Sequence, residues 1–128
     1  MDLDAYFDST DGQGVLATAD AKGKVDLAIY SKPRFLDKKN VVFIMSDRLT
    51  HHNLQTNPNA AYLFQEAREG YNGKRLILRK VADKENGPDV EVLRRKCTVP
   101  EGTGKRLGRS YTVKFRIKAV RPLVGEGA

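Results

Sequence analysis

Cysteine and histidine are scarce in this sequence. It contains one cysteine, Cys97, and two adjacent histidines, His51 and His52. A single cysteine cannot form an intrachain disulfide, which fits a reducing cytoplasm, and these three residues offer too few ligands at suitable spacing for a zinc site. Neighbouring residues of a helix point in different directions, so at most one histidine faces a ligand, and we expect each to be solvated. The scarcity predicts a cytoplasmic protein without a metal site.

Long hydrophobic runs are also lacking. No apolar stretch approaches the roughly 20 residues of a membrane-spanning helix. The acidic start, Met1-Asp2-Leu3-Asp4, has no apolar core of the kind that signal peptides carry. A chain of 128 residues is long enough to bury one hydrophobic core but not two. We therefore expect a single domain over residues 1–128 and no membrane partner.

Basic residues outnumber acidic ones but form no recognisable nucleic-acid motif. The 23 lysines and arginines against 16 acids give a net charge of +7, which favours an anionic partner. Nucleic acid, a phosphorylated cofactor or a merely basic surface would each account for this charge. No block of five basic residues occurs, and the glycines of 101–108 neither follow a strand nor open a helix as a phosphate-binding loop requires.

Alternating apolar and polar residues predict about six strands and three short helices. The clearest strand is 111–119, whose basic face, carrying Lys114, Arg116 and Lys118, is either exposed to solvent or able to hold phosphates. Pro33 cannot donate to a sheet, so the strand before it must kink there before Phe35 and Leu36 resume it. The expected strands are 14–20, 25–36 with this kink, 41–46, 60–64, 74–81 and 111–119, and the expected helices are 3–7, 47–57 and 88–97, the last with Cys97 on its buried face.

This order of elements predicts a mainly β protein with short helices. Strands and helices do not alternate as a doubly wound sheet requires, so we predict a six-stranded antiparallel β-barrel. Side chains fill the interior of so small a barrel. A ligand would therefore bind outside the barrel or at a boundary between subunits.

The stretch from Val41 to Pro58 reads as a strand, a polar junction and a short helix. Ser46 and Asp47 are both good helix N-caps, and Pro58 ends the segment. The free N–H groups of the first helical turn, with nearby hydroxyls and a cation, would form a phosphate cradle. Equally, Asp47 could simply cap a surface helix beside a solvated Arg48.

Several segments share their order and spacing with a known family. They are 14–20, 22–24, 28–31, 35–37, 41–44 and the stretch Asn53-Leu54-Gln55-Thr56-Asn57-Pro58-Asn59-Ala60-Ala61. Together they resemble the FMN-binding split-barrel family related to pyridoxamine 5'-phosphate oxidase, over roughly residues 12 to 82. The resemblance implies a homodimeric FMN-dependent oxidoreductase with a split β-barrel fold.

The resemblance also implies which residues contact the cofactor. The kinked second strand would run beside the flavin ring, and the strand-to-helix junction would hold the ribityl chain and phosphate. A residue on the following strand would reach the flavin of the partner subunit, and a lysine could add a cation. The implied residues are Ala28, Ile29, Tyr30 and Ser31 at the ring, Met45, Ser46, Arg48, Thr50 and Asn53 at the junction, Gln65 from the partner, and Lys74.

The chain departs from the family at two points. Leu49 stands where many relatives have lysine, so Arg48 or Lys74 must supply the cation, and a deazaflavin remains an alternative to FMN. The segment after Val81 lacks the oxidase's substrate-binding residues, so pyridoxal phosphate synthesis is not expected. The residues identify no catalytic group, electron donor or acceptor.

The rival hypothesis is a small basic β-barrel that binds nucleic acid without catalysis. The charge and the row Lys114, Arg116 and Lys118 favour it. The aromatic residues Tyr111 and Phe115 lie on the apolar face of their strand, so few aromatics are free to stack on bases. We therefore prefer the flavin hypothesis.

Overall fold

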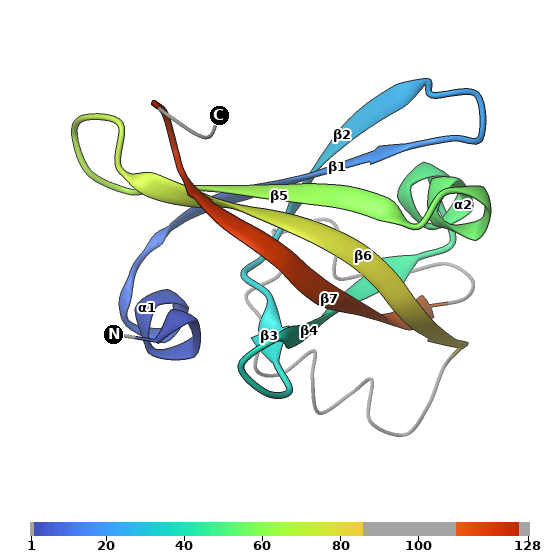
Figure 1. The fold of residues 1–128 in the computed structure, drawn as a ribbon, viewed down its shortest axis with the longest axis horizontal. Coiled ribbons are helices and arrows are strands. Elements are labelled where there is room, and N and C mark those ends of the chain that lie inside the picture. The colour runs from blue at the N-terminus through green and yellow to red at the C-terminus, as the bar shows by residue number, and fades with distance from the viewer. Residues whose placement is uncertain (1, 86–109, 126–128) are drawn as a thin grey trace.

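The computed structural model describes residues 2–85 and 110–125. Seven antiparallel strands in this part of the chain form one sheet in the order β2-β1-β5-β6-β7-β4-β3 (Figure 1). The elements in chain order are α1 (Leu3–Ser9), β1 (Gly12–Ala19), β2 (Val25–Tyr30), β3 (Arg34–Phe35), β4 (Asn40–Ser46), α2 (Leu49–Thr56), β5 (Asn59–Glu66), β6 (Gly73–Glu85) and β7 (Ser110–Pro122).

The predicted antiparallel β class and the first two helices are confirmed, but the kink at Pro33 divides one expected strand into two. β2 ends at Tyr30 and pairs with β1, whereas the two-residue β3 begins at Arg34 and pairs with β4. Proline has no N–H to give to a ladder, so the chain leaves one neighbour there and joins another. This change of partner explains seven strands where six were expected. The expected helix 88–97, with Cys97, lies outside the described residues.

A single hydrophobic core lies on the inner face of the sheet. Alternate residues of the central strands point inward, and Tyr62, Phe64, Leu76 and Phe115 are all fully buried. The core is closed on one side by Phe7 of α1. Burial of each such side chain contributes about 1.5–3 kcal/mol of transfer free energy, so the period-two pattern of the strands largely accounts for the fold.

The two longest strands, β6 and β7, lie side by side across the middle of the molecule (Figure 1). Their register shifts twice, between Ile77 and Leu78 and between Lys80 and Ala82. At the first shift Ile77 pairs with Ala119 and Leu78 with Ile117, so Lys118 has no opposite residue. Such bulges bend a strand and re-aim its side chains. No helix among the described residues is long and apolar enough to cross a membrane.

Gly14 of β1 leaves room for the side chain of Tyr62. A Cβ at Gly14 would overlap the Tyr62 hydroxyl and its ring carbon. That hydroxyl donates a hydrogen bond to the carbonyl of Ser31 over 3.1 Å. The close packing of Gly14 against Tyr62 therefore links β1, β5 and the kink after β2.

We expect Gly14→Ala to lower the free energy of unfolding by about 1–3 kcal/mol, because the added methyl group overpacks the core. Urea denaturation measures this loss. Tyr62→Phe removes the hydroxyl that the methyl group meets first, so the double variant should lose less than the sum of the two single losses. Additive losses, or a stable Gly14→Ala protein, would contradict the overlap.

Candidate functional site

The junction between β4 and α2 begins its helix later than the sequence indicated. The N-cap residue is Arg48, in extended conformation, and no side chain caps the helix. The prediction of Ser46 or Asp47 as N-cap is wrong, because the N–H of Arg48 bonds the carbonyl of Ser46 over 2.9 Å and forms a tight turn first. The first N–H groups of α2 are therefore not satisfied by a capping side chain.

Three of the expected site residues meet at this junction. Tyr30, the last residue of β2, shares a hydrogen bond with the hydroxyl of Thr50, and the charge of Arg48 acts on the same phenol. Burial raises the pKa of Tyr30, while the Thr50 hydrogen bond opposes the rise. The phenol is consequently neutral at physiological pH. Residues from a strand end and a helix start thus come together although they are 18 or more positions apart in the chain.

The other residues at the end of β2 are divided between the two faces of the sheet. Ala28 and Tyr30 are half-buried, whereas Ile29 points outward with 57% of its surface exposed. Ser31 follows Tyr30, and its carbonyl accepts the bond from Tyr62. Tyr30 is therefore the residue of this group that contacts the junction through Thr50, Ala28 shares its half-buried face, and Ile29 lies on the opposite face.

Two of the expected junction residues have structural partners. Met45 is 1% exposed and belongs to the hydrophobic core. Asn53 lies on the buried face of α2, and its side-chain amide donates to the hydroxyl of Thr18 over 3.1 Å. Ser46 is half-buried at the end of β4. Of the junction residues, Thr50 hydrogen-bonds Tyr30, and Arg48 is near enough for its charge to lower the pKa of the phenol.

Lys74 and Gln65 lie far from the junction within one protomer. Lys74 pairs with Pro122 at one end of β7, whereas Ser46 pairs with Ser110 at the other end. A strand of this length separates its ends by roughly 30–40 Å. Lys74 instead lies over the ring of Tyr6, 4.8 Å from its centroid. Within one chain, Lys74 therefore cannot replace the lysine that many relatives have at the position of Leu49. Of the two candidate cations, Arg48 remains.

A buried histidine beside the junction was missed by sequence reasoning. His51 is 7% exposed, and its Nε2 lies 2.6 Å from Oδ2 of Asp83. Its ring stacks on Tyr111 with centroids 3.6 Å apart, and the Gln55 amide donates to the same Asp83 oxygen over 2.8 Å. The expectation of a solvated histidine is wrong for His51, whereas His52 is exposed.

The reason for this error is that β6 runs past its expected end at Val81. The extension to Glu85 carries Asp83 to α2, 32 residues from His51 in the chain. No local pattern reports such a contact. The contact between His51 and Asp83 attaches α2 to the sheet immediately after Thr50. No group of three or more metal-ligating side chains occurs in the part of the chain described.

Comparison with known proteins gives a likeness in structure but not in sequence. No protein-family profile and no curated protein sequence matches the chain. An FMN-binding protein from Syntrophomonas wolfei subsp. wolfei has a TM-score of 0.75 and 16% identity, over 95% of this chain and 84% of that one. A candidate pyridoxamine 5'-phosphate oxidase from Lactobacillus delbrueckii has a TM-score of 0.65 and 15% identity, over 94% and 91%.

An F420 reductase is similar to the same degree, with a TM-score of 0.65 and 16% identity over 94% of this chain and 97% of that one. At these identities the likeness shows the fold alone. The chain has the split β-barrel fold of FMN-binding, pyridoxamine 5'-phosphate oxidase-like proteins, as the resemblance of residues 12–82 implied.

The adjacent residues His51 and His52 offer a matched test of the contacts that His51 makes with Asp83 and Tyr111. We expect His51→Ala to lower the free energy of unfolding by about 2 kcal/mol, because it leaves buried hydrogen-bonding groups and a stacking surface without their partner. His52→Ala should change it by less than about 0.5 kcal/mol, since that side chain is exposed. Chemical denaturation of both variants makes the comparison, and equal effects would contradict it.

Proposed function

We propose that this protein binds FMN and serves as a flavin-dependent redox protein, with the cofactor phosphate at the strand-to-helix junction 45–53. The observation that carries the proposal is the meeting of Tyr30, Thr50 and Arg48 at the uncapped start of α2. This meeting occurs in a fold that is shared with FMN-binding proteins.

The donors at the junction suit a phosphate dianion. Arg48 is exposed, and its guanidinium forms no ion pair with the described residues. The first N–H groups of α2 and the positive end of its dipole add to the attraction. Charge-assisted hydrogen bonds of this kind are roughly twice as strong as neutral ones. The cradle therefore provides one positive charge and backbone donors, and the nearby carboxylate of Asp26 offsets part of this charge.

Thr50 orients the phenol of Tyr30 for this purpose. The hydrogen bond between them lowers the pKa of Tyr30, as a bond does when the Thr50 O–H donates to the phenol oxygen. Burial keeps the phenol protonated, so the Tyr30 O–H is then free to donate to a phosphate oxygen. Thr50 is itself only 5% exposed, so its hydroxyl is held in place. Thr50 is thus a positioning residue behind the Tyr30 donor.

The end of β2 would lie along the flavin ring. Ala28, Tyr30 and Ser31 present a half-buried edge there, and backbone N–H groups near the kink at Pro33 can bond the polar edge of the ring. A bound flavin supplies the hydride or electron transfer itself, while the protein binds and orients it. A deazaflavin is the alternative cofactor, in keeping with the fold shared with an F420 reductase and with Leu49 in place of lysine.

A second copy of the chain would complete the site. The edge strand β2 exposes 75% of Val25, 69% of Leu27 and 57% of Ile29 on one face. Their register partners on β1 and β5, which include Val15 and Leu63, continue the same apolar face. So continuous a surface is unusual on a monomer and typical of an interface.

Gln65 of β5 follows Leu63 by two residues and therefore shares this outer face. A homodimer formed through the face would bring Gln65 towards the partner's flavin. This position agrees with the role that the family resemblance implies for Gln65.

The phosphate cradle is tested by comparing two cofactors that differ only in the phosphate. Arg48→Ala should weaken FMN binding by about tenfold or more while changing riboflavin binding little, because only FMN carries the dianion. Flavin absorbance and fluorescence titrations measure both affinities. Lys22→Ala, which removes an exposed cation in the β1–β2 turn, serves as the charge-matched control. Equal losses for FMN and riboflavin would show that Arg48 does not bind phosphate, and a protein that binds no flavin would refute the proposal as a whole.

The dimer is tested with two exposed leucines. Leu27→Asp places a charge in the middle of the apolar face and should convert the dimer to a monomer, which light scattering after size-exclusion chromatography detects. Leu36→Asp introduces the same charge at a leucine that is 53% exposed outside this face and should leave the dimer intact. A wild-type monomer, or a dimer that tolerates Leu27→Asp, would contradict the assigned interface.

A further inference from the structure

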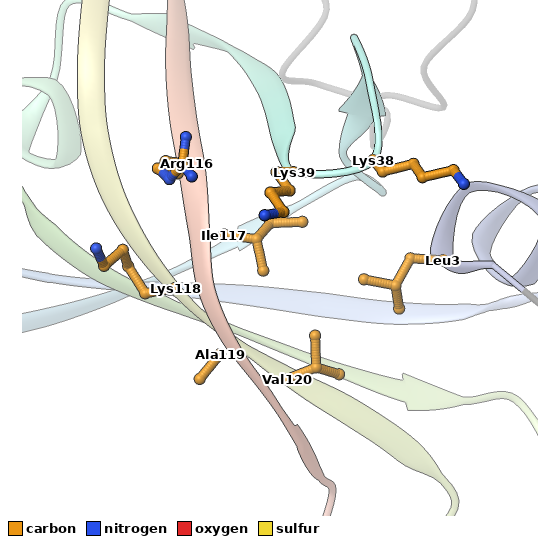
Figure 2. Close-up of a pocket in the computed structure, with 8 residues that line it drawn as sticks. All are labelled: Leu3, Lys38, Lys39, Arg116, Ile117, Lys118, Ala119 and Val120. Carbon is orange, nitrogen blue, oxygen red and sulfur yellow. The ribbon is translucent and has the colours of Figure 1, made fainter.

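A basic cleft lies apart from the junction, and we propose that it is a second anion site. It has a volume of about 400 Å³ and lies between α1, the β3–β4 turn and β7 (Figure 2). The ligand class that its lining fits is a small organic polyanion, one that carries several phosphate groups and a flat apolar part. The volume lies within the range of small-molecule sites.

The cleft is distinct from the proposed flavin phosphate cradle. Arg116, which lines it, pairs with Asn40 at the start of β4, whereas the cradle adjoins Ser46 at the end of the same strand. Six residues of strand separate the two positions by roughly 20 Å. One phosphate group cannot occupy both places, so a ligand of the cleft is additional to the flavin.

The polar side chains that line the cleft among the described residues are all cationic. Lys38 and Lys39 come from the β3–β4 turn, and Arg116 and Lys118 come from β7 (Figure 2). None of these four head groups forms an ion pair or a side-chain hydrogen bond with any described residue. No acidic residue from 2–85 or 110–125 lines the cleft. Several like charges gathered around a concave surface focus a positive potential that favours a multiply charged anion.

The acid of the β3–β4 turn, Asp37, is engaged by the backbone of that turn. The carboxylate of Asp37 accepts hydrogen bonds from the N–H of Lys39 over 2.8 Å and from the N–H of Asn40 over 2.9 Å. These bonds, the Lys39 one first, hold the pKa of Asp37 below its usual range. Asp37 thus shapes the turn that presents Lys38 and Lys39.

The backbone around the cleft is held by two further features. The N–H of Ile117 donates to the carbonyl of Lys39 over 2.7 Å, which ties the turn to β7 beyond the last β4–β7 pair. The bulge at Lys118 leaves this residue without an opposite partner, and Figure 2 shows Lys118 on one side of β7 and Ile117 on the other. The cations are therefore presented by a fixed turn and a fixed bulge, which reduces the ordering cost of binding.

An apolar floor distinguishes this cleft from a simple patch of lysines. Leu3 of α1 and Ile117 of β7 pack against the hydrophobic core and also line the cleft, and Val120, 45% exposed, continues the surface. Figure 2 shows Leu3, Ile117 and Val120 around the same opening. A flat ring can cover these side chains while its phosphates reach the cations.

The same features argue against a nucleic-acid strand as the ligand. Single-stranded nucleic acid requires aromatic side chains on which successive bases stack, and none of the described residues that line the cleft is aromatic. Lys38 and Lys39 belong to the turn rather than to β7, so the four cations do not form a single row along one strand. The lining therefore favours a compact anion over a polymer.

The test uses ATP as a probe, because it combines phosphates with a flat ring, and titrates the 128-residue chain by calorimetry at low salt. Arg116→Gln/Lys118→Gln should weaken ATP binding by about tenfold or more, since two charge-assisted contacts are removed. Lys22→Gln/Lys24→Gln removes the same charge from the β1–β2 turn and should leave the affinity within about twofold. A similar loss in both double variants, or in neither, would overturn the proposal.

Further arms of the titration separate the parts of the ligand. Val120→Asn should weaken ATP binding but leave tripolyphosphate binding unchanged, and an effect on neither or on both would contradict the apolar floor.

A short single-stranded oligonucleotide that binds more tightly than ATP would overturn the choice of a compact ligand. ATP binding should be the same with and without FMN, whereas competition would place both in one site. The cleft can be judged even if FMN fails to bind, because the ATP titrations do not require flavin.

Discussion

The hydrogen bond from Tyr62 to the carbonyl of Ser31 holds together the parts of the molecule on which the proposed site depends. Tyr62 is fully buried in the central strand β5, and it reaches the kink at Pro33 only because Gly14 has no side chain. Fixing Ser31 fixes Tyr30 next to it, and Tyr30 then meets Thr50 at the start of α2. On the other side of α2, His51 is held by Asp83 and Tyr111. The start of this helix is thus anchored from two directions while its N–H groups remain uncapped.

The chain carries a net charge of +7, and several of its acids are committed to local structure. Asp37 binds the N–H groups of its own turn, and Glu66 accepts a hydrogen bond from Tyr6 over 2.6 Å and pairs with Arg68. Hydrogen bonds of this kind, that from Tyr6 first, lower the pKa of Glu66. The cations at the junction and in the cleft have no such partners among the described residues, so they are available to an anion.

The two faces of the sheet show why alternation alone cannot place a core. In β2 the large apolar residues Val25, Leu27 and Ile29 point outward, and Ala28 and Tyr30 point inward. A period of two shows that a strand has two different faces but does not say which one is buried within the protomer. In β7 the same alternation does bury Val113 and Phe115, and its basic residue Arg116 is exposed. The apolar outer face of β2 supports the proposed dimer, in which this face would be buried.

The β class, most strand positions and the first two helices could be predicted from the sequence, because they depend on periodicity and on turn residues within a few positions of each other. The strand-to-helix junction at Ser46 to Thr50 was also predicted, and the segments that resemble the family agree with the fold. Three features required the folded chain: Arg48 is the N-cap, Lys74 lies at the far end of β7, and His51 is buried against Asp83. The cleft also required it, because the hydrogen bond between Lys39 and Ile117 joins a turn and a bulged strand that are 117 − 39 = 78 positions apart. Contacts of this range depend on strand register and on bulges, which are set by the packing of the whole sheet and leave no local pattern in the chain.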